Sequence, residues 1–448
     1  MPGLSESLAR TCSADWRDRL DATQRETLER IVRTAFIDTA ACVLAGRGEA
    51  VARIAVDWAV ARYAASVQSS LLFGEQRLAS SGAALVNGIA GHALDYDDVA
   101  LAGHPSVVLA PALWAEHERS GVGGFDLVQA YAKGYAVWAE LQRRQKASLH
   151  ARGWHPSAVL GVVAAAAAVG ALRRLSTQQL THAIGIAASM AGGVIANFGS
   201  MTKPLHAGRA AEGGIAAAEL AQAGLTASPD ALDGATGLLQ ALAGPGNADC
   251  DAPCGTALET TLLRVRPGIK KYPVCYAAHR VVDGVLDLAR EHRIEPAEVT
   301  AVDVTISETT ASVLRQHEPA SVDEARFSLE FCVATALTRG RLGIAEVSPA
   351  TLQDPAVRQL MRSVRTHTVQ TRCPLEPSFA YTDRVTVRLR DGSRLDSGPI
   401  RFARGHAELP LDEAQLLEKL HGCAQPHERA LVDGIVERIS AALGTPAL

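Results

Sequence analysis

The sequence is poor in aromatic residues, which are only 4% of its 448 residues. Its core must therefore be built from Ala, Val and Leu, with helices packed closely together. It has no long basic run, and its net charge is −4. Nucleic acid is excluded as a partner, because binding phosphates requires clustered Lys and Arg.

We expect no segment that targets or anchors the chain. The longest apolar run, residues 158–172, is too short for a bilayer span, which needs about 20 residues. The start of the chain, MPGLSESLARTCSADWRDRL, has no apolar stretch typical of a secretory signal. The eight cysteines are scattered along the chain. These features predict a reduced, cytoplasmic protein with no membrane partner.

Nucleotide and metal motifs are not apparent either. Neither a strand followed by GxGxxG nor a GxxxxGK[ST] loop occurs. Cys250 and Cys254 are the only cysteines close together, and no histidine lies near them. This spacing predicts no metal site, because a structural metal needs more ligands than two thiolates.

The hydrophobic pattern predicts a mainly α protein with a smaller α+β domain. Length and composition favour two domains, with a third as the alternative. Helical periodicity dominates residues 21–263, where Asp21 and Gln24 form a capping pattern and Gly46 ends the first long helix. Further helices are expected at 81–93, 158–172, 181–196 and 206–224.

The pattern changes after Pro267. Residues 302–306 and 385–389 alternate as half-buried strands, the second running into the Asp391-Gly392 turn. Helices are expected at 279–292, 329–337 and 355–364, and helix returns at 411–443. We therefore predict a helical domain at 1–265, completed by 405–448, and an α+β lid domain with an antiparallel sheet at 266–404.

Three polar segments interrupt the alanine-rich helices: GHALDYDDVALAGHPS (91–106), GWHPS (153–157) and SMTKPLH (200–206). Each contains a histidine or lysine directly before a proline, and proline disfavours helical backbone in the residue before it. His104, His155 and Lys203 are therefore expected in extended backbone at helix joints. Three such joints predict a polar pocket built from loop ends.

These segments, with NFGSMTKPLHAGRAA (197–211), KKYPVCYAAH (270–279) and the weaker EARFSLEFCVATAL (324–337), resemble the signature blocks of the MmgE/PrpD family. The resemblance implies a homodimer whose active site lies between a helical domain and a lid. It also implies small di- and tricarboxylate substrates and no metal or other cofactor.

The resemblance assigns catalytic roles to individual residues. The catalytic aspartate falls on Asp95, the two histidines on His104 and His155, and the first lysine on Lys203. The second lysine aligns with Lys270, with Lys271 as the alternative. Expected substrate contacts are Lys271, Trp154, Thr202, His206 and His279.

The side chains of these residues have the chemical properties that a reaction on a polycarboxylate requires. Lysines supply the fixed positive charge that a polycarboxylate needs, and histidine moves protons near neutral pH. Which histidine is the base stays open, and so does the role of His206 and His279 as substrate contacts or buried hydrogen-bond partners. His92 is expected to be structural, whereas Asp97 and Asp98 are equally consistent with capping and with the site.

The resemblance leaves the reaction open. We favour a hydro-lyase like 2-methylcitrate dehydratase, with an epimerase of an iminodisuccinate-like dicarboxylate or a cis-aconitate decarboxylase as alternatives. Val99 stands where the decarboxylase pattern has a threonine, and the interval from Asp95 to His104 is one residue shorter. A non-catalytic dimeric binding protein is a further alternative. The DxDD of residues 95–98 also resembles class II terpene cyclases, which need aromatic-lined cavities that this composition does not supply.

Overall fold

The computed structural model describes residues 3–71, 73–375 and 379–446. The chain forms two compact units. The helical unit comprises Met1–Ala93, Asp97–Pro267 and Glu413–Leu448, and the α+β unit comprises Leu94–Tyr96 and Gly268–Asp412. This agrees with the predicted fold class, while the domain limits expected from the sequence stay a prediction.

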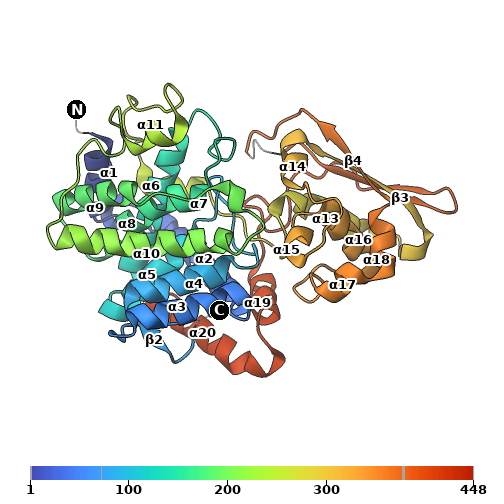
Figure 1. The fold of residues 1–448 in the computed structure, drawn as a ribbon, viewed down its shortest axis with the longest axis horizontal. Helices are drawn as coiled ribbons and strands as arrows, with labels where there is room; N and C mark the ends of the chain where they lie inside the picture. The colour runs from blue at the N-terminus through green and yellow to red at the C-terminus, as the bar shows by residue number, and fades with distance from the viewer. Residues whose placement is uncertain (1–2, 72, 376–378, 447–448) are drawn as a thin grey trace. The chain divides into compact units, whose positions relative to one another are not determined.

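Small residues bring the central helices of the helical unit close together. In this unit α10 packs against α4, α8 and α9 (Figure 1). A Cβ added to Gly208 of α10 would lie 2.3 Å from the carbonyl oxygen of Leu85, and one on Gly88 of α4 would lie 2.8 Å from the Gly208 Cα. Larger side chains would force these axes apart, as the sequence predicted. The helices up to α12 are α1 Leu4–Ser13, α2 Ala22–Gly46, α3 Ala50–Tyr63, α4 Ser80–His92, α5 Ser106–Ser120, α6 Phe125–Arg143, α7 Pro156–Val159, α8 Gly161–Leu172, α9 Thr177–Ser189, α10 Thr202–Gln222, α11 Leu238–Ala243 and α12 Thr261–Arg264.

Some of the expected helix limits hold and others shift by several residues. The capping box of Asp21 and Gln24 is present at the start of α2, which ends at Gly46 as predicted. The helix expected at 158–172 is broken at Leu160 into α7 and α8. The helix expected at 181–196 ends at Ser189, and a short 3-10 turn follows at Ile195–Asn197. The glycines at 192 and 193 lie in the break between them.

The C-terminal segment returns to the helical unit as two helices, α19 Glu413–Gly422 and α20 Arg429–Leu443, which both pack against α2. The single helix expected at 411–443 is thus divided. Lys419 of α19 places its Nζ 2.5 Å from Oδ1 of Asp38 in α2, and both side chains are buried. This ion pair ties the C-terminal segment to α2.

We expect Lys419→Met to lower the free energy of unfolding by about 3–5 kcal/mol, because it leaves the Asp38 carboxylate buried without its cation. Urea denaturation followed by far-UV circular dichroism measures the loss. The double variant Asp38→Leu/Lys419→Met removes both charges and should recover most of the stability. Equal destabilisation by the single and the double variant would contradict this account.

The α+β unit contains a four-stranded sheet in the order β4-β3-β5-β6. Its strands are β3 Val299–Ser307, β4 Val364–Val369, β5 Arg384–Leu389 and β6 Arg394–Asp396. The expected antiparallel pairing holds for β3, β5 and β6, but β4 runs parallel to β3, so the sheet is mixed. The helical segment between β3 and β4, residues 308–361, makes that parallel return possible, because a parallel connection needs a long crossover.

A continuous apolar core fills the α+β unit, with Val281 and Val285 of α13, Val302 and Val304 of β3, and Phe331 of α16 all buried. Its helices are α13 His279–Glu291, α14 Glu308–Val313, α15 Val322–Ala325, α16 Leu329–Arg339, α17 Pro349–Gln353 and α18 Pro355–Met361. In the helical unit a small hairpin pairs β1 Ser69–Ser70 with β2 Arg77–Leu78. Across the described part of the chain, no helix combines the length and apolarity required for a membrane span.

Candidate active site

Hydrogen bonds hold the loop that joins α4 to α5 in an uncommon backbone conformation. Leu101 and Ala102 both have left-handed backbone, with φ of 51° and 60°. Reciprocal backbone hydrogen bonds between Ala100 and Gly103 close this turn, and Trp138 Nε1 donates to the Leu101 carbonyl at 3.2 Å. Such backbone is unfavourable for residues other than glycine and persists only where surrounding contacts enforce it. The turn leads directly into His104, whose amide donates to Ser157 Oγ at 3.0 Å.

Asp97 and Asp98 are adjacent and buried, but they face different partners. Asp98 accepts hydrogen bonds from the amide and hydroxyl of Ser106, the first residue of α5. Burial raises the pKa of Asp98 to about 8. Asp97 lies 2.9 Å from Nδ1 of His92 and 3.3 Å from Nδ1 of His104. The Asp98 carboxylate therefore takes the capping role, and the Asp97 carboxylate orients His92. The His104 ring lies nearer to the Asp98 carbonyl, at 2.8 Å from Nδ1, than to the Asp97 carboxylate.

His155 is fixed by backbone contacts on both sides. Its amide donates to the Gly193 carbonyl at 3.0 Å, and its own carbonyl accepts from Ala158 at the start of α7. Its backbone is extended, with φ −86° and ψ 110°, as predicted from the following proline. Gly193 has φ +153°, and a Cβ there would lie 2.4 Å from the Ala158 Cβ. Glycine is thus required at position 193, where the backbone that pairs with residues 154 and 155 runs close to α7.

Four histidines gather at the ends of α4, α5, α7 and α10. We call His92, His104, His155 and His206 the histidine cluster. The His92 ring centroid lies 4.7 Å from that of His104 and 5.7 Å from that of His155, against which it stacks. Nδ1 of His155 is 3.1 Å from Nδ1 of His206. The cluster places His104, His155 and His206 together, three of the residues singled out from the sequence.

Burial keeps part of the cluster uncharged. It lowers the pKa of His155 well below 6.5, and the neighbouring histidines and Lys203 lower it further. Burial likewise lowers the pKa of His206 to about 4, with help from His92 and Lys203. At neutral pH both imidazoles are therefore neutral and can accept a proton.

Lys203 places a buried cation beside these rings. Its Nζ lies 5.1 Å from the ring centroid of Phe198, whose ring packs edge-on against His155 at 4.9 Å. Lys203 is the second residue of α10, not the extended residue predicted from Pro204. The proline is accommodated because amides in the first turn of a helix have no intrahelical acceptor, so its missing N–H costs nothing there.

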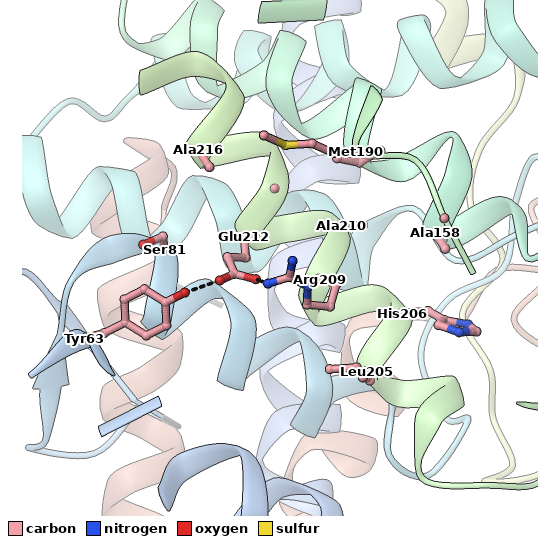
Figure 2. Close-up of a pocket in the computed structure, with 13 residues that line it drawn as sticks. Tyr63, Ser81, Ala158, Met190, Leu205, His206, Arg209, Ala210, Glu212 and Ala216 are labelled. Atoms are coloured by element: carbon pink, nitrogen blue, oxygen red, sulfur yellow. Dashed lines mark hydrogen bonds and ion pairs between the residues drawn. The ribbon is translucent and has the colours of Figure 1, made fainter. Parts of the chain in front are cut away.

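A pocket of about 400 Å³ lies along α10 and reaches His206. Its charged side chains are paired within the pocket: Figure 2 shows Arg209 and the Tyr63 hydroxyl both directed at the Glu212 carboxylate. Burial is the main reason that the pKa of Tyr63 rises to about 12. Because Glu212 neutralises Arg209, this pocket is a weaker carboxylate-binding candidate than the surroundings of Lys203.

Asp95 and Lys270 form an ion pair inside the α+β unit. Nζ of the buried Lys270 lies 2.5 Å from the Asp95 carbonyl oxygen and 3.2 Å from its Oδ2. Asp95 has left-handed backbone, with φ of 52°. Lys271 is only partly buried, and its carbonyl accepts a hydrogen bond from the Tyr96 hydroxyl. Of the two lysines that the sequence left open, Lys270 is the one paired with Asp95.

Comparison with known proteins matches two family domains, the second of which extends past the α+β unit into the C-terminal helices of the helical unit. The MmgE/PrpD N-terminal domain matches residues 13–251, and the MmgE/PrpD C-terminal domain matches residues 272–440. The chain belongs to the MmgE/PrpD family. It is 30% identical over 371 residues to the cis-aconitate decarboxylase of Homo sapiens, covering 80% of this chain and 75% of that protein. The corresponding protein of Mus musculus is 29% identical over 371 residues.

A more distant relative is the cis-aconitate decarboxylase of Aspergillus terreus, which is 26% identical over 345 residues. That alignment covers 71% of this chain and 69% of the fungal protein. The family resemblance inferred from the sequence blocks is therefore confirmed.

The remaining predicted contact residues of this MmgE/PrpD chain are spread over both units. Trp154 pairs with Val194 through its backbone, beside His155, and Thr202 is the first residue of α10. His279 is buried in the α+β unit, where its Nε2 lies 3.3 Å from the Val274 carbonyl and its ring contacts those of Tyr272 and Tyr276. Their roles as substrate contacts stay predictions.

His92 is the member of the cluster that sequence reasoning did not assign to the site. It lies at the end of α4, where a helical histidine gives no local signal of function. The available signal was its spacing: Asp97 follows five residues later, across the helix end, where a carboxylate can fold back onto the ring.

Proposed function

We propose that this MmgE/PrpD protein is a lyase acting on a small tricarboxylate, with decarboxylation of cis-aconitate as the leading reaction. The names of the matched relatives support the substrate. One observation supports the chemistry most directly: His104 and His155 lie together beside the buried cation of Lys203. The sequence favoured dehydration, and the decarboxylase names of the relatives move decarboxylation ahead of it.

The geometry suggests a role for each group. Lys203 provides a fixed charge for a substrate carboxylate. Asp97 lies beside Nδ1 of His104 and can stabilise the imidazolium, which makes His104 the proposed proton donor. His155 is neutral and suits proton acceptance. The assignment of Asp95 and Lys270 to the same reaction rests on the family resemblance and stays a prediction.

In the proposed reaction, the bond between a carboxylate carbon and the methylene carbon of cis-aconitate breaks and CO₂ leaves. Its electron pair forms a new double bond to the central carbon. The electron pair of the original double bond then takes a proton at the far carbon from His104. His155, whose ring centroid lies 6.2 Å from that of His104, accepts a proton from solvent and returns it to His104. The product is an unsaturated five-carbon dicarboxylate. An anion develops along this path, so a nearby fixed cation lowers the barrier.

A hydro-lyase reaction on a 2-methylcitrate-like substrate is the second candidate. Val99 stands where the decarboxylase pattern carries a hydroxyl group, and this difference favours the hydro-lyase. Dehydration needs a base to take a proton beside a carboxylate and an acid to protonate the leaving hydroxyl. His155 and His104 are suited to those two roles, respectively.

Proton NMR in deuterated buffer distinguishes these reactions. With cis-aconitate we expect terminal methylene signals, release of CO₂ and one deuterium in the saturated methylene of the product. Alkene formation from citrate or 2-methylcitrate without CO₂ would instead establish the hydro-lyase. Deuterium exchange into a dicarboxylate without elimination would identify an epimerase. No conversion of any tricarboxylate by the folded protein would contradict the proposal.

A further inference from the structure

Three members of the histidine cluster are arranged as metal ligands. One ring nitrogen from each of His92, His104 and His155 lies within 4.8 Å of the others. Tetrahedral zinc with Zn–N bonds of about 2.0–2.1 Å needs nitrogens roughly 3.3 Å apart. Small rotations of the three side chains would bring their nitrogens to the separation that zinc needs. We propose that these three imidazoles bind one divalent transition-metal ion of the zinc class.

The surroundings of two of the three rings match the outer shell of a histidine metal site. Ligating histidines ordinarily donate their second ring N–H to a carboxylate or a carbonyl, which fixes the ring and its tautomer. His92 Nδ1 lies 2.9 Å from the Asp97 carboxylate, and His104 Nδ1 lies 2.8 Å from the Asp98 carbonyl. His155 Nδ1 is engaged with His206. All three rings are thus held through Nδ1.

A buried ring nitrogen without a hydrogen-bond partner is independent evidence for a ligand. Nε2 of His92 is buried and has no hydrogen-bond partner among the described residues. The whole His92 side chain is inaccessible to solvent. A buried polar atom without a partner is costly, and native structures rarely retain one without a role. A metal ion would use this lone pair directly.

The donor set also selects the class of ion. Imidazole nitrogens suit zinc and its neighbours in the first transition row, whereas magnesium and calcium prefer oxygen ligands. Three histidines leave a fourth position for water or a carboxylate. A bound ion would occupy the lone pairs needed for proton transfer, so we infer that it inhibits turnover. This consequence, unlike the binding itself, rests on the proposed function.

Binding is tested without any substrate. The protein is first treated with EDTA and then titrated with Zn²⁺ against a fluorescent chelator. We expect one Zn²⁺ per chain, with affinity at least tenfold lower in His92→Ala and in Asp97→Ala. His367→Ala, which changes an exposed histidine on β4, is the matched control and should bind like the unaltered protein. Equal affinity for Zn²⁺ in the unaltered protein and in His92→Ala would contradict the proposed site.

Cobalt substitution identifies the ligands and keeps the test valid if His92→Ala does not fold. Co²⁺ held by three imidazoles gives visible absorption typical of a four- or five-coordinate ion, and His104→Gln should abolish it. A thiolate-to-cobalt charge-transfer band would place the ion on cysteines and overturn the proposal. Zn²⁺ should also raise the melting temperature of the unaltered protein, since a ligand of the native state stabilises it.

Inhibition is measured separately, with the substrate identified by NMR. We expect stoichiometric Zn²⁺ to abolish turnover and EDTA to restore it. Full activity in protein shown to hold Zn²⁺ at these histidines would overturn the inhibitory inference. Absence of any lyase activity would count against the proposed function alone, because the binding titration does not depend on it.

Discussion

His155→Ala is expected to lower kcat by about 10²–10⁴-fold, because a positioned acid–base group typically contributes that much to the rate. The structure supports this role: His155 is buried, held by backbone contacts and kept neutral by its surroundings. Steady-state kinetics on the substrate identified by NMR measures the change.

Folding must be separated from chemistry, since His155 fills buried space. His155→Gln retains most of the volume and should be equally slow, with a melting temperature close to that of the unaltered protein. His182→Ala is a matched control, because His182 is partly buried on α9 and accepts from the Ala227 amide outside the cluster. Added imidazole should restore part of the activity to His155→Ala. Near-normal turnover by a well-folded His155→Ala protein would remove His155 from the mechanism and leave His104 as the acid–base group.

Lys203→Ala is expected to lower kcat/KM roughly ten- to hundredfold, mostly through a higher KM. Losing a hydrogen bond to a charged group costs about 1.5–3 kcal/mol, which corresponds to a factor of that size. The cation sits at the start of α10, against the Phe198 ring and beside the cluster. Its loss should therefore remove a binding contact for a carboxylate without removing the proton-transfer groups.

The conservative variant distinguishes charge from packing. Lys203→Arg keeps the positive charge and should retain more activity than Lys203→Ala, whereas Lys203→Met keeps apolar bulk and should not. A similar KM for the unaltered protein and Lys203→Met would exclude Lys203 as a carboxylate contact. Initial rates over a range of substrate concentrations are sufficient for this comparison.

The sequence by itself determined the features that depend on local chemistry. The capping pattern of Asp21 and Gln24 predicted the start of α2, and glycine- and alanine-rich stretches predicted the closely packed central helices. Alternating residues around Val302 and Val385 predicted β3 and β5. The proline after His155 predicted its extended backbone. Each signal acts through near neighbours in the chain, so no tertiary contact was needed to recognise it.

Only the tertiary structure decided what depends on approach in space. Asp97 and Asp98 have the same chemistry and adjacent positions, yet the Asp97 carboxylate pairs with His92 and the Asp98 carboxylate caps α5. The helical backbone of Lys203 and the parallel pairing of β4 were likewise set by packing. His92 joined the cluster because α4 ends where the rings of His104 and His155 meet. His155 is more than fifty positions from His92 and from His104 in the sequence. Local propensities carry no information about contacts between residues so far apart.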